Sequence, residues 1–138
     1  MNIPRRLWVG ALAVFLVRTA YAGLVHGPFF LTPLVYARFP TAMAPAMNLP
    51  ALLGVEALIT ALLVGAYQAY FGNRRPTAAT AVRFGLLVGI AIYLPQNLLN
   101  LILLQPVHVP LVVAWVGAGL IGSVVSVITL RAVTRLSD

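Results

Sequence analysis

The fold is decided by two apolar runs with a short connection between them. Residues 81–130 read AVRFGLLVGIAIYLPQNLLNLILLQPVHVPLVVAWVGAGLIGSVVSVITL. A helix rises about 1.5 Å per residue, so each run can cross the hydrocarbon layer of a membrane, which is about 30 Å thick. We expect helices at about residues 79–104 and 111–130, and the short connection QPVHVP makes them antiparallel neighbours.

Two more apolar runs of spanning length precede this hairpin, at about residues 7–25 and 51–71. The segment between them, residues 26–50, contains five prolines and is expected to be an outer loop, because proline interrupts helices. Its stretch FFLTPLVYARF could lie along the membrane interface. The chain is therefore predicted to be one all-α domain, residues 1–138, folded as an integral membrane four-helix bundle.

The first run also has features of a secretory signal peptide. It has a basic start, an apolar centre and the small-residue pattern Ala20-Tyr21-Ala22. Arg18 interrupts the apolar centre just before that pattern, which argues against cleavage. We therefore expect this run to be a spanning helix.

The composition favours a membrane protein and excludes several functions. Of the 138 residues, 62% are hydrophobic and 8% are charged, whereas a soluble domain carries about a quarter charged residues. The net charge of +7 comes from nine arginines and two acids, and most of the arginines stand at the ends of apolar runs, which is typical of membrane topology and not of a nucleic-acid-binding face. Cysteine is absent, which excludes disulfides, thiolate catalysis and cysteine-bound metals.

The arginines also predict the orientation of the bundle. By the positive-inside rule the arginine-rich side faces the cytoplasm, so we expect both termini there and the protein in the cell membrane. Arg38 alone is predicted on the outer side. The arginines expected on the inner side are Arg5, Arg6, Arg74, Arg75, Arg83, Arg131 and Arg135.

Polar side chains interrupt the third run in the stretch YLPQNLLN, residues 93–100. Four of them share one helix face, because they follow the spacing i, i+3, i+4, i+7: Tyr93, Gln96, Asn97 and Asn100. The three amides are expected roughly 6–12 Å below the outer surface. Pro95 adds local polarity, because its missing N–H frees a backbone carbonyl one turn earlier.

Two charged residues are expected at a similar depth on other helices. Glu56 is placed roughly 8 Å, and Arg18 roughly 13 Å, below the outer surface. A charge there costs about 2.5–3.5 kcal/mol, so we predict that Arg18 pairs with Glu56 and that the three amides fill the remaining donors and acceptors. This polar cluster has two interpretations: hydrogen bonding between helices, or a buried site for a polar ligand, a proton or an ion.

The two histidines, His26 and His108, are both expected near the outer surface. Together with Glu56 they could ligate a metal, and by themselves they could ligate haem iron. An interfacial histidine more commonly bonds a backbone carbonyl. We therefore expect no metal and no cofactor, with His26 and His108 as weak candidates.

The remaining residue inventory argues against an enzyme. The two acids, Glu56 and Asp138, are expected near opposite membrane faces, too far apart for paired-carboxylate chemistry. Ser123 and Ser126 are expected in the inner half of the membrane, away from both histidines, so a serine–histidine relay is not expected. Lysine is absent, which excludes a Schiff base.

Small residues recur at every fourth position on three predicted helices, a spacing that lets helix backbones approach closely. We expect these stripes to pack within the bundle, with self-association or docking to a larger membrane complex as the alternative. The stripes are Ala57, Ala61 and Gly65; Gly85 and Gly89; and Ala118, Gly122 and Ser126, with Gly119 and Ser123 beside them. Five aromatic residues are expected to anchor the helices at the interfaces and not to form a binding cage: Trp8, Tyr36, Tyr70, Phe71 and Trp115.

The order of these features resembles known membrane proteins. Residues 81–125 resemble the third and fourth helices of small bacterial four-helix membrane proteins, and YAGLVHGPFF is similar to their first helix, which often ends in a glycine-plus-aromatic turn. This resemblance implies four spanning helices and no established activity. The stretch PALLGVEALITALLVG resembles the second helix of DoxX-type membrane proteins, which carry a glutamate there, and implies a redox-associated accessory role.

We therefore expect a non-catalytic membrane protein, either an accessory subunit or a self-associating bundle, in contact with the lipid bilayer and not with nucleic acid. The second hypothesis is a carrier or binder of a small ligand or proton. In it Glu56 titrates, and the lining comes from Tyr93, Gln96, Asn97 and Asn100. The third hypothesis is a haem- or quinone-associated redox subunit that uses His26 and His108.

Overall fold

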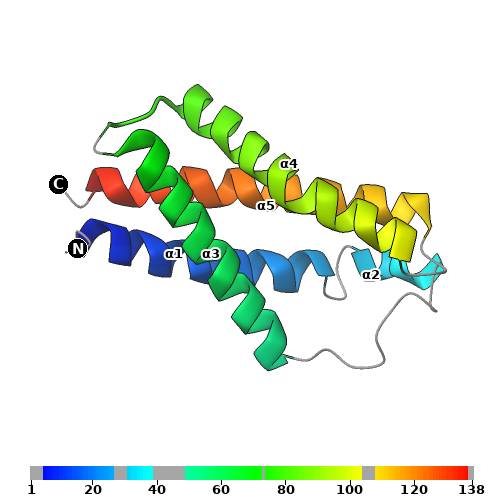
Figure 1. Ribbon diagram of the computed structural model, residues 1–138. Helices are drawn as coiled ribbons and strands as arrows, with labels where there is room; N and C mark the ends of the chain where they lie inside the picture. Colours follow the sequence, from blue (N-terminus) through cyan, green and yellow to red (C-terminus); the bar gives the residue numbers. More distant parts are fainter. Residues whose placement is uncertain (1–4, 27–30, 39–48, 73, 104–107, 137–138) are drawn as a thin grey trace.

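The computed structural model describes residues 5–26, 31–38, 49–72, 74–103 and 108–136. Every regular element in these ranges is a helix, as the sequence predicts. Two short elements, α2 (Leu31–Leu34) and the 3-10 helix η1 (Tyr36–Arg38), follow the first long helix (Figure 1). Four helices are long and apolar enough to cross a membrane: α1 (Arg5–His26), α3 (Leu49–Phe71), α4 (Ala78–Leu103) and α5 (Val109–Leu136).

The last helix is longer than its apolar run. The predicted end was residue 130, but α5 continues about two turns further, to Leu136. Backbone hydrogen bonding does not require apolar side chains, and the two arginines of this extension donate to the carbonyl of Pro76. Hydropathy therefore indicates the apolar part of α5 and not the whole helix.

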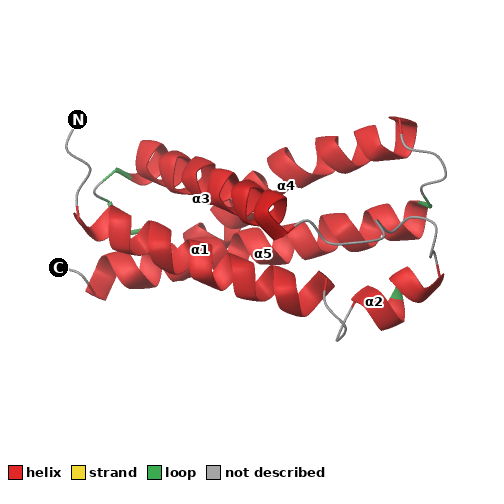
Figure 2. Ribbon diagram, turned by 90° about the horizontal axis from the view of Figure 1, so that it is seen from below, coloured by secondary structure: helices red, strands yellow, loops and turns green. Residues whose placement is uncertain are grey.

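The four long helices are not parallel to one another. α4 and α5 lie side by side and antiparallel, as the short connection predicts, and α1 packs along α5. α3 crosses this layer obliquely, so that its beginning diverges from the end of α4 (Figures 1 and 2). We call the end of the bundle where α1 begins and α5 ends the arginine end, and the end where α1 ends and α3 begins the loop end.

Glycines bring the backbones of α4 and α5 together. A Cβ atom on Gly85 would lie 2.8 Å from the Cα of Val124, and one on Gly89 would lie 3.2 Å from the Cα of Leu120. Real Cβ atoms do not approach a backbone atom as closely as the first of these distances, so glycine is required at Gly85. The predicted packing face on this helix is therefore confirmed.

The small-residue stripe on α3 behaves differently from the one on α4. Ala57, Ala61 and Gly65 are all exposed, and a Cβ atom on Gly65 would meet no atom within 4 Å. Our expectation that this stripe packs inside the bundle was wrong for the single chain. The reason is that α3 contacts α1 through its Glu56 face, so the stripe points outward.

The apolar core lies toward the arginine end. Its fully buried members include Val14, Leu63 and Leu130, which come from α1, α3 and α5. Aromatic rings attach α3 to the start of α4: the ring centroids of Phe71 and Phe84 are 5.1 Å apart. Phe71, which we expected at the interface, is therefore part of the core.

The turn between α3 and α4 is stabilised by local hydrogen bonds. Gly72 has a φ of 56°, a left-handed conformation that favours glycine, and its N–H donates to the carbonyl of Gln68. The Thr77 hydroxyl caps α4 by accepting a hydrogen bond from the N–H of Thr80 at 3.2 Å. These two caps keep the turn short and place it beside the end of α5.

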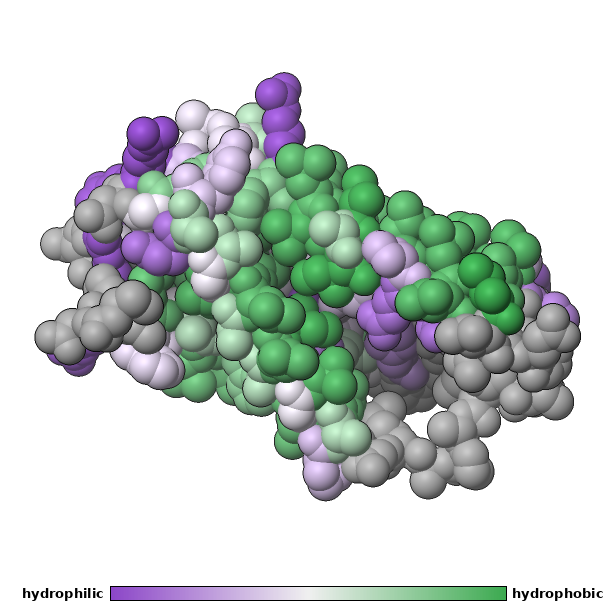
Figure 3. All heavy atoms as spheres, in the orientation of Figure 1, coloured by the Kyte–Doolittle hydropathy of each residue, from purple (hydrophilic) through white to green (hydrophobic). Residues whose placement is uncertain are grey.

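The apolar character of the surface is consistent with helices that are long enough to cross a membrane. In the space-filling view the flank between the two ends is mostly hydrophobic, and hydrophilic residues gather toward the arginine end (Figure 3). Many large apolar side chains of the long helices are exposed, such as Leu58, Leu62 and Leu87. A soluble protein rarely exposes so much contiguous apolar surface, whereas a lipid-facing flank requires it.

Candidate functional site

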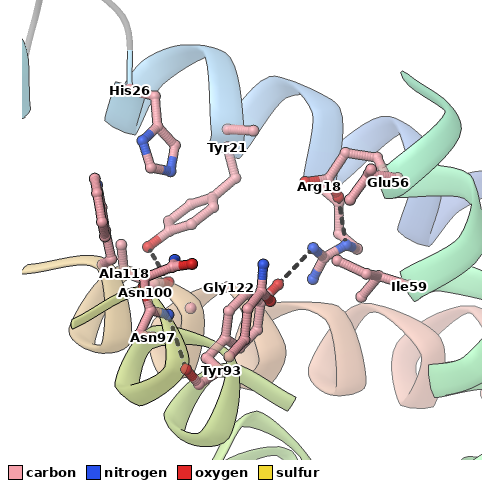
Figure 4. A pocket seen from close by; sticks show the side chains of 15 residues that line it. Arg18, Tyr21, His26, Glu56, Ile59, Tyr93, Asn97, Asn100, Ala118 and Gly122 are labelled. Carbon is pink, nitrogen blue, oxygen red and sulfur yellow. Dashed lines mark hydrogen bonds and ion pairs between the residues drawn. The ribbon is translucent and has the colours of Figure 1, made fainter. Parts of the chain in front are cut away.

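A buried ion pair joins α1 to α3. The Nε atom of Arg18 lies 2.7 Å from Oε2 of Glu56, and the side chain of Arg18 is 5% exposed (Figure 4). Both residues stand inside their apolar helices, in the half nearer the loop end, where an unpaired charge would be costly. The pairing predicted from the sequence is therefore confirmed.

A tyrosine of α4 provides the second contact of the guanidinium. Arg18 Nη2 donates a hydrogen bond of 2.8 Å to the hydroxyl oxygen of Tyr93, so that one side chain contacts both α3 and α4 (Figure 4). We expected the amides of α4 to take this role, and that expectation was wrong. The side chain of Asn97 turns back along its own helix and donates to the carbonyl of Tyr93 at 2.8 Å.

A cavity of about 310 Å³ lies beside the ion pair, between α1, α3, α4 and α5. The structure brings every residue of the predicted polar cluster to its wall: Arg18, Glu56, Tyr93, Gln96, Asn97 and Asn100. The cavity also has apolar walls, formed in part by Val55 and Ile59 of α3. The polar cluster is thus the lining of a space and not a closed network of hydrogen bonds.

We did not identify Tyr21, Gly119 and Gly122 from the sequence as part of this wall. The hydroxyl of Tyr21 donates to the carbonyl of Ala118 at 2.8 Å, and a Cβ atom on Gly122 would lie 3.0 Å from the ring of Tyr21. Gly119 makes room in the same way for the ring of Tyr93. The sequence does place these glycines and tyrosines at matching depths in their helices, which could have indicated the contacts. Hydropathy, however, does not show which helices are neighbours or which of their faces are in contact.

Trp115 also lines the cavity, although we expected it to be an interfacial anchor. Trp8, by contrast, is 63% exposed and lies near the arginine end, where an anchor is expected. Tyr70 is exposed as well, and the side chain of Tyr36 lies outside the described residues. The two tryptophans of this chain therefore stand in different surroundings.

One donor in the cavity wall has no acceptor. Nη1 of Arg18 is buried and makes no hydrogen bond with any residue that the structure describes. The hydroxyls of Thr60 and Ser123 are also buried and make no hydrogen bond with any residue that the structure describes. A buried donor without an acceptor costs about 1–3 kcal/mol, and more when it is charged, so such a group points to an acceptor supplied by water or a ligand.

The cavity is open on one side. Val55 and Gln96, which belong to its lining, are exposed, and they stand on α3 and α4, the two helices that diverge toward the loop end. In the space-filling view, hydrophilic atoms are visible in a recess beside α3 (Figure 3). A molecule could therefore reach the ion pair between α3 and α4.

The histidines do not form a metal site with the acid. His26 lines the cavity near the end of α1, whereas His108 precedes α5 and is exposed, outside the lining. Among the described residues there is no group of three or more His, Cys, Asp or Glu side chains placed to hold a metal ion. The weak metal candidates of the sequence are therefore not brought together by this fold.

Comparisons of the chain with models of protein families, with curated proteins and with solved structures found no match. The resemblances to small bacterial four-helix proteins and to DoxX-type proteins stay predictions. The function is therefore argued below from the residues of the cavity.

Proposed function

We propose that this chain is a non-catalytic protein of the cell membrane that binds the polar group of a small amphipathic molecule in the cavity beside Arg18. The observation that carries the proposal is the buried Nη1 of Arg18, a charged donor of a residue that lines the cavity, which has no acceptor among the described residues. Both termini are proposed to be cytoplasmic, because the arginines gather where α1 begins and α5 ends.

The chemistry of the wall defines the class of ligand. Nη1 requires an acceptor, and because Glu56 already neutralises Arg18, a neutral carbonyl or hydroxyl oxygen suits the site as well as an anion. The amides of Gln96 and Asn100 can add donors and acceptors. Val55 and Ile59 favour an apolar portion beside this polar group, so the preferred ligand is an amphipathic molecule.

The position of the opening supports entry from the membrane. The exposed lining residues Val55 and Gln96 stand on α3 and α4, and both helices carry exposed apolar side chains, such as Leu58 and Leu98. The volume of about 310 Å³ is at the lower end of ligand pockets in proteins, which measure about 300–1,000 Å³. The cavity therefore suits the head of a membrane-soluble molecule, with its apolar tail remaining in the lipid.

Self-association or an accessory role is the second candidate. The observation that favours it is the outward stripe of Ala57, Ala61 and Gly65 on α3, a surface on which another helix can approach closely. Native mass spectrometry on protein extracted gently from the host membrane tests both candidates. A small-molecule adduct supports the binding function, and a second polypeptide or a multiple of the chain mass supports association.

The tryptophans allow a direct binding assay. In a Trp8→Phe variant, Trp115 is the single tryptophan and reports the occupancy of the cavity by fluorescence. We expect its emission to change when membrane-soluble compounds with carbonyl, carboxylate or hydroxyl groups are titrated, such as quinones, fatty acids and fatty alcohols. Arg18→Lys, which keeps a positive charge beside Glu56 but removes Nη1, should weaken the response about tenfold.

A pair of neighbouring substitutions provides the control. Ile59→Phe adds volume inside the cavity and should reduce the response, whereas Leu58→Phe adds a ring on the exposed face of α3 and should not. The absence of any response across the compound classes, together with the absence of an adduct from the host membrane, would contradict the proposed function.

A further inference from the structure

Five arginines gather at the arginine end of the bundle. They come from the first turn of α1, from the α3–α4 turn and from the last turns of α5, and they line one shallow cleft: Arg6, Arg74, Arg75, Arg131 and Arg135. The solvent-filled part of the cleft is small, about 20 Å³, so the cleft can hold a group against its surface but cannot enclose one. Three separate parts of the chain thus bring positive charge to one place.

Two of these guanidiniums converge on a single backbone carbonyl. Nε of Arg131 donates to the oxygen of Pro76 at 3.0 Å, and Nη2 of Arg135 donates to the same oxygen at 3.2 Å. Arg131 and Arg135 are also one turn apart on α5, a spacing at which like charges repel. A guanidinium carries several N–H donors, so both retain donors that the carbonyl does not use.

No carboxylate in the described part of the chain offsets this charge. Glu56 is the acidic residue that the structure describes, and it pairs with Arg18 away from the arginine end. Arg74, Arg131 and Arg135 therefore place three positive charges close together with no carboxylate partner among the described residues. A bound anion would relieve the repulsion and use the remaining donors.

We propose that this cleft binds the phosphate group of an anionic phospholipid. Arginine pairs with phosphate through two parallel hydrogen bonds, and the convergent Arg131 and Arg135 present such donors side by side. The cleft lies at the end of the membrane-spanning helices, which is the depth of lipid headgroups. Trp8 and Tyr70, 63% and 68% exposed, stand near the same end, where amphipathic rings favour the headgroup region.

This assignment rests on the proposed membrane insertion but not on the polar cavity. Basic clefts between spanning helices at the cytoplasmic surface are suited to anionic headgroups, whereas a zwitterionic headgroup also places a positive charge close to the arginines. The selectivity between an anionic and a zwitterionic lipid is therefore the property to measure.

The experiment compares phosphatidylglycerol with phosphatidylcholine on the full chain in a neutral detergent. Native mass spectrometry counts the lipid retained, and the melting temperature is measured with each lipid added to the micelles. We expect phosphatidylglycerol to be retained and to raise the melting temperature, and phosphatidylcholine to do neither. Arg131→Gln/Arg135→Gln should weaken the retention of phosphatidylglycerol about tenfold.

A charge-matched control distinguishes lipid binding at this cleft from general electrostatic attraction by the net positive charge. Arg5→Gln/Arg83→Gln removes the same two charges from exposed positions outside the cleft and should retain the lipid as the wild type does. Circular dichroism checks that each variant is helical. If the α5 variant does not fold, the single variant Arg74→Gln, in the exposed turn, should weaken retention in the same direction.

Three results would overturn the assignment. The control pair could lose the lipid as strongly as the cleft pair, the two lipids could be retained equally, or inorganic phosphate could displace phosphatidylglycerol and give the same thermal protection. The last result would identify a soluble anion as the ligand. Recovery of the chain in the soluble fraction would refute membrane insertion itself, before any lipid is added.

Discussion

One guanidinium connects three helices. Arg18 of α1 contacts Glu56 of α3 and Tyr93 of α4 with two of its nitrogens, and its third nitrogen, Nη1, is buried without a partner among the described residues. Removing one member of a buried ion pair leaves an uncompensated charge, which is strongly destabilising, whereas replacing both members by apolar residues of similar size is often neutral. Replacing either member alone is therefore expected to lower the free energy of unfolding strongly, whether or not the pair also binds a ligand.

We predict a strong interaction between the two members of this pair. Arg18→Met and Glu56→Leu, made singly, should each lower the free energy of unfolding by about 3 kcal/mol, and the double variant should recover most of this loss. Unfolding in mixed micelles with increasing SDS measures all three variants. Additive losses in the double variant would contradict the prediction.

The same double variant separates the structural and binding roles. It should be folded but should show no fluorescence response from Trp115, because the unpaired donor of Arg18 is gone from the cavity wall. A response equal to that of the wild type would mean that the pair serves stability alone.

The helices differ in how far their small residues take part in packing. Gly85 of α4 lies against the backbone of α5, whereas Gly65 of α3 faces open space. Both have the same sequence signature, a glycine four positions from another small residue. The difference arises because Gly85 stands on the face of α4 that contacts α5, whereas α3 turns its Glu56 face toward α1, so that Gly65 points outward.

We predict opposite effects of alanine at these two glycines. Gly85→Ala should destabilise the bundle by about 1–3 kcal/mol, since its Cβ atom would lie 2.8 Å from the Cα of Val124. Gly65→Ala should be neutral or stabilising by up to about 1 kcal/mol, because alanine favours the helix and meets no atom. The SDS unfolding assay measures both, and a larger loss in Gly65→Ala would show that its face is covered by a partner.

At the scale of the whole molecule, the oblique course of α3 creates the site. Its aromatic end is attached to the start of α4 by Phe71 and Phe84, and from there the two helices diverge (Figure 1). The space left between them is closed on the far side by α1 and α5 and forms the cavity. A bundle of parallel helices with the same sequence would instead bury the amides of α4 against α3.

The orientation of the molecule can be tested without background labelling, because the chain has no cysteine. Single cysteines at Ala78→Cys, the first residue of α4, and Val109→Cys, the first residue of α5, mark the two ends of the bundle. A membrane-impermeant thiol reagent added to intact cells should label Val109→Cys and leave Ala78→Cys unlabelled until the cells are permeabilised. The reverse pattern would contradict cytoplasmic termini.

The sequence by itself determined the four helices, the adjacency of α4 and α5, and the Arg18–Glu56 ion pair. These features depend on quantities that each segment carries locally: hydropathy over a spanning length, a connection too short to allow another arrangement, and the cost of a charge at a given depth. The same local cost correctly placed the amides near the ion pair, but it did not show that Tyr93 would bond to Arg18 in their place.

The tertiary structure decided the tilt of α3, the replacement of the amides by Tyr93 as partner of Arg18, and the cavity with Trp115 in its wall. Each of these depends on how far a helix is rotated about its own axis and tilted against its neighbours. That rotation is set by contacts between residues distant in the sequence, such as Gly119 with Tyr93 and Gly122 with Tyr21. Hydropathy is nearly the same all around such helices, so the sequence pattern carries little information on the rotation, and packing decides it.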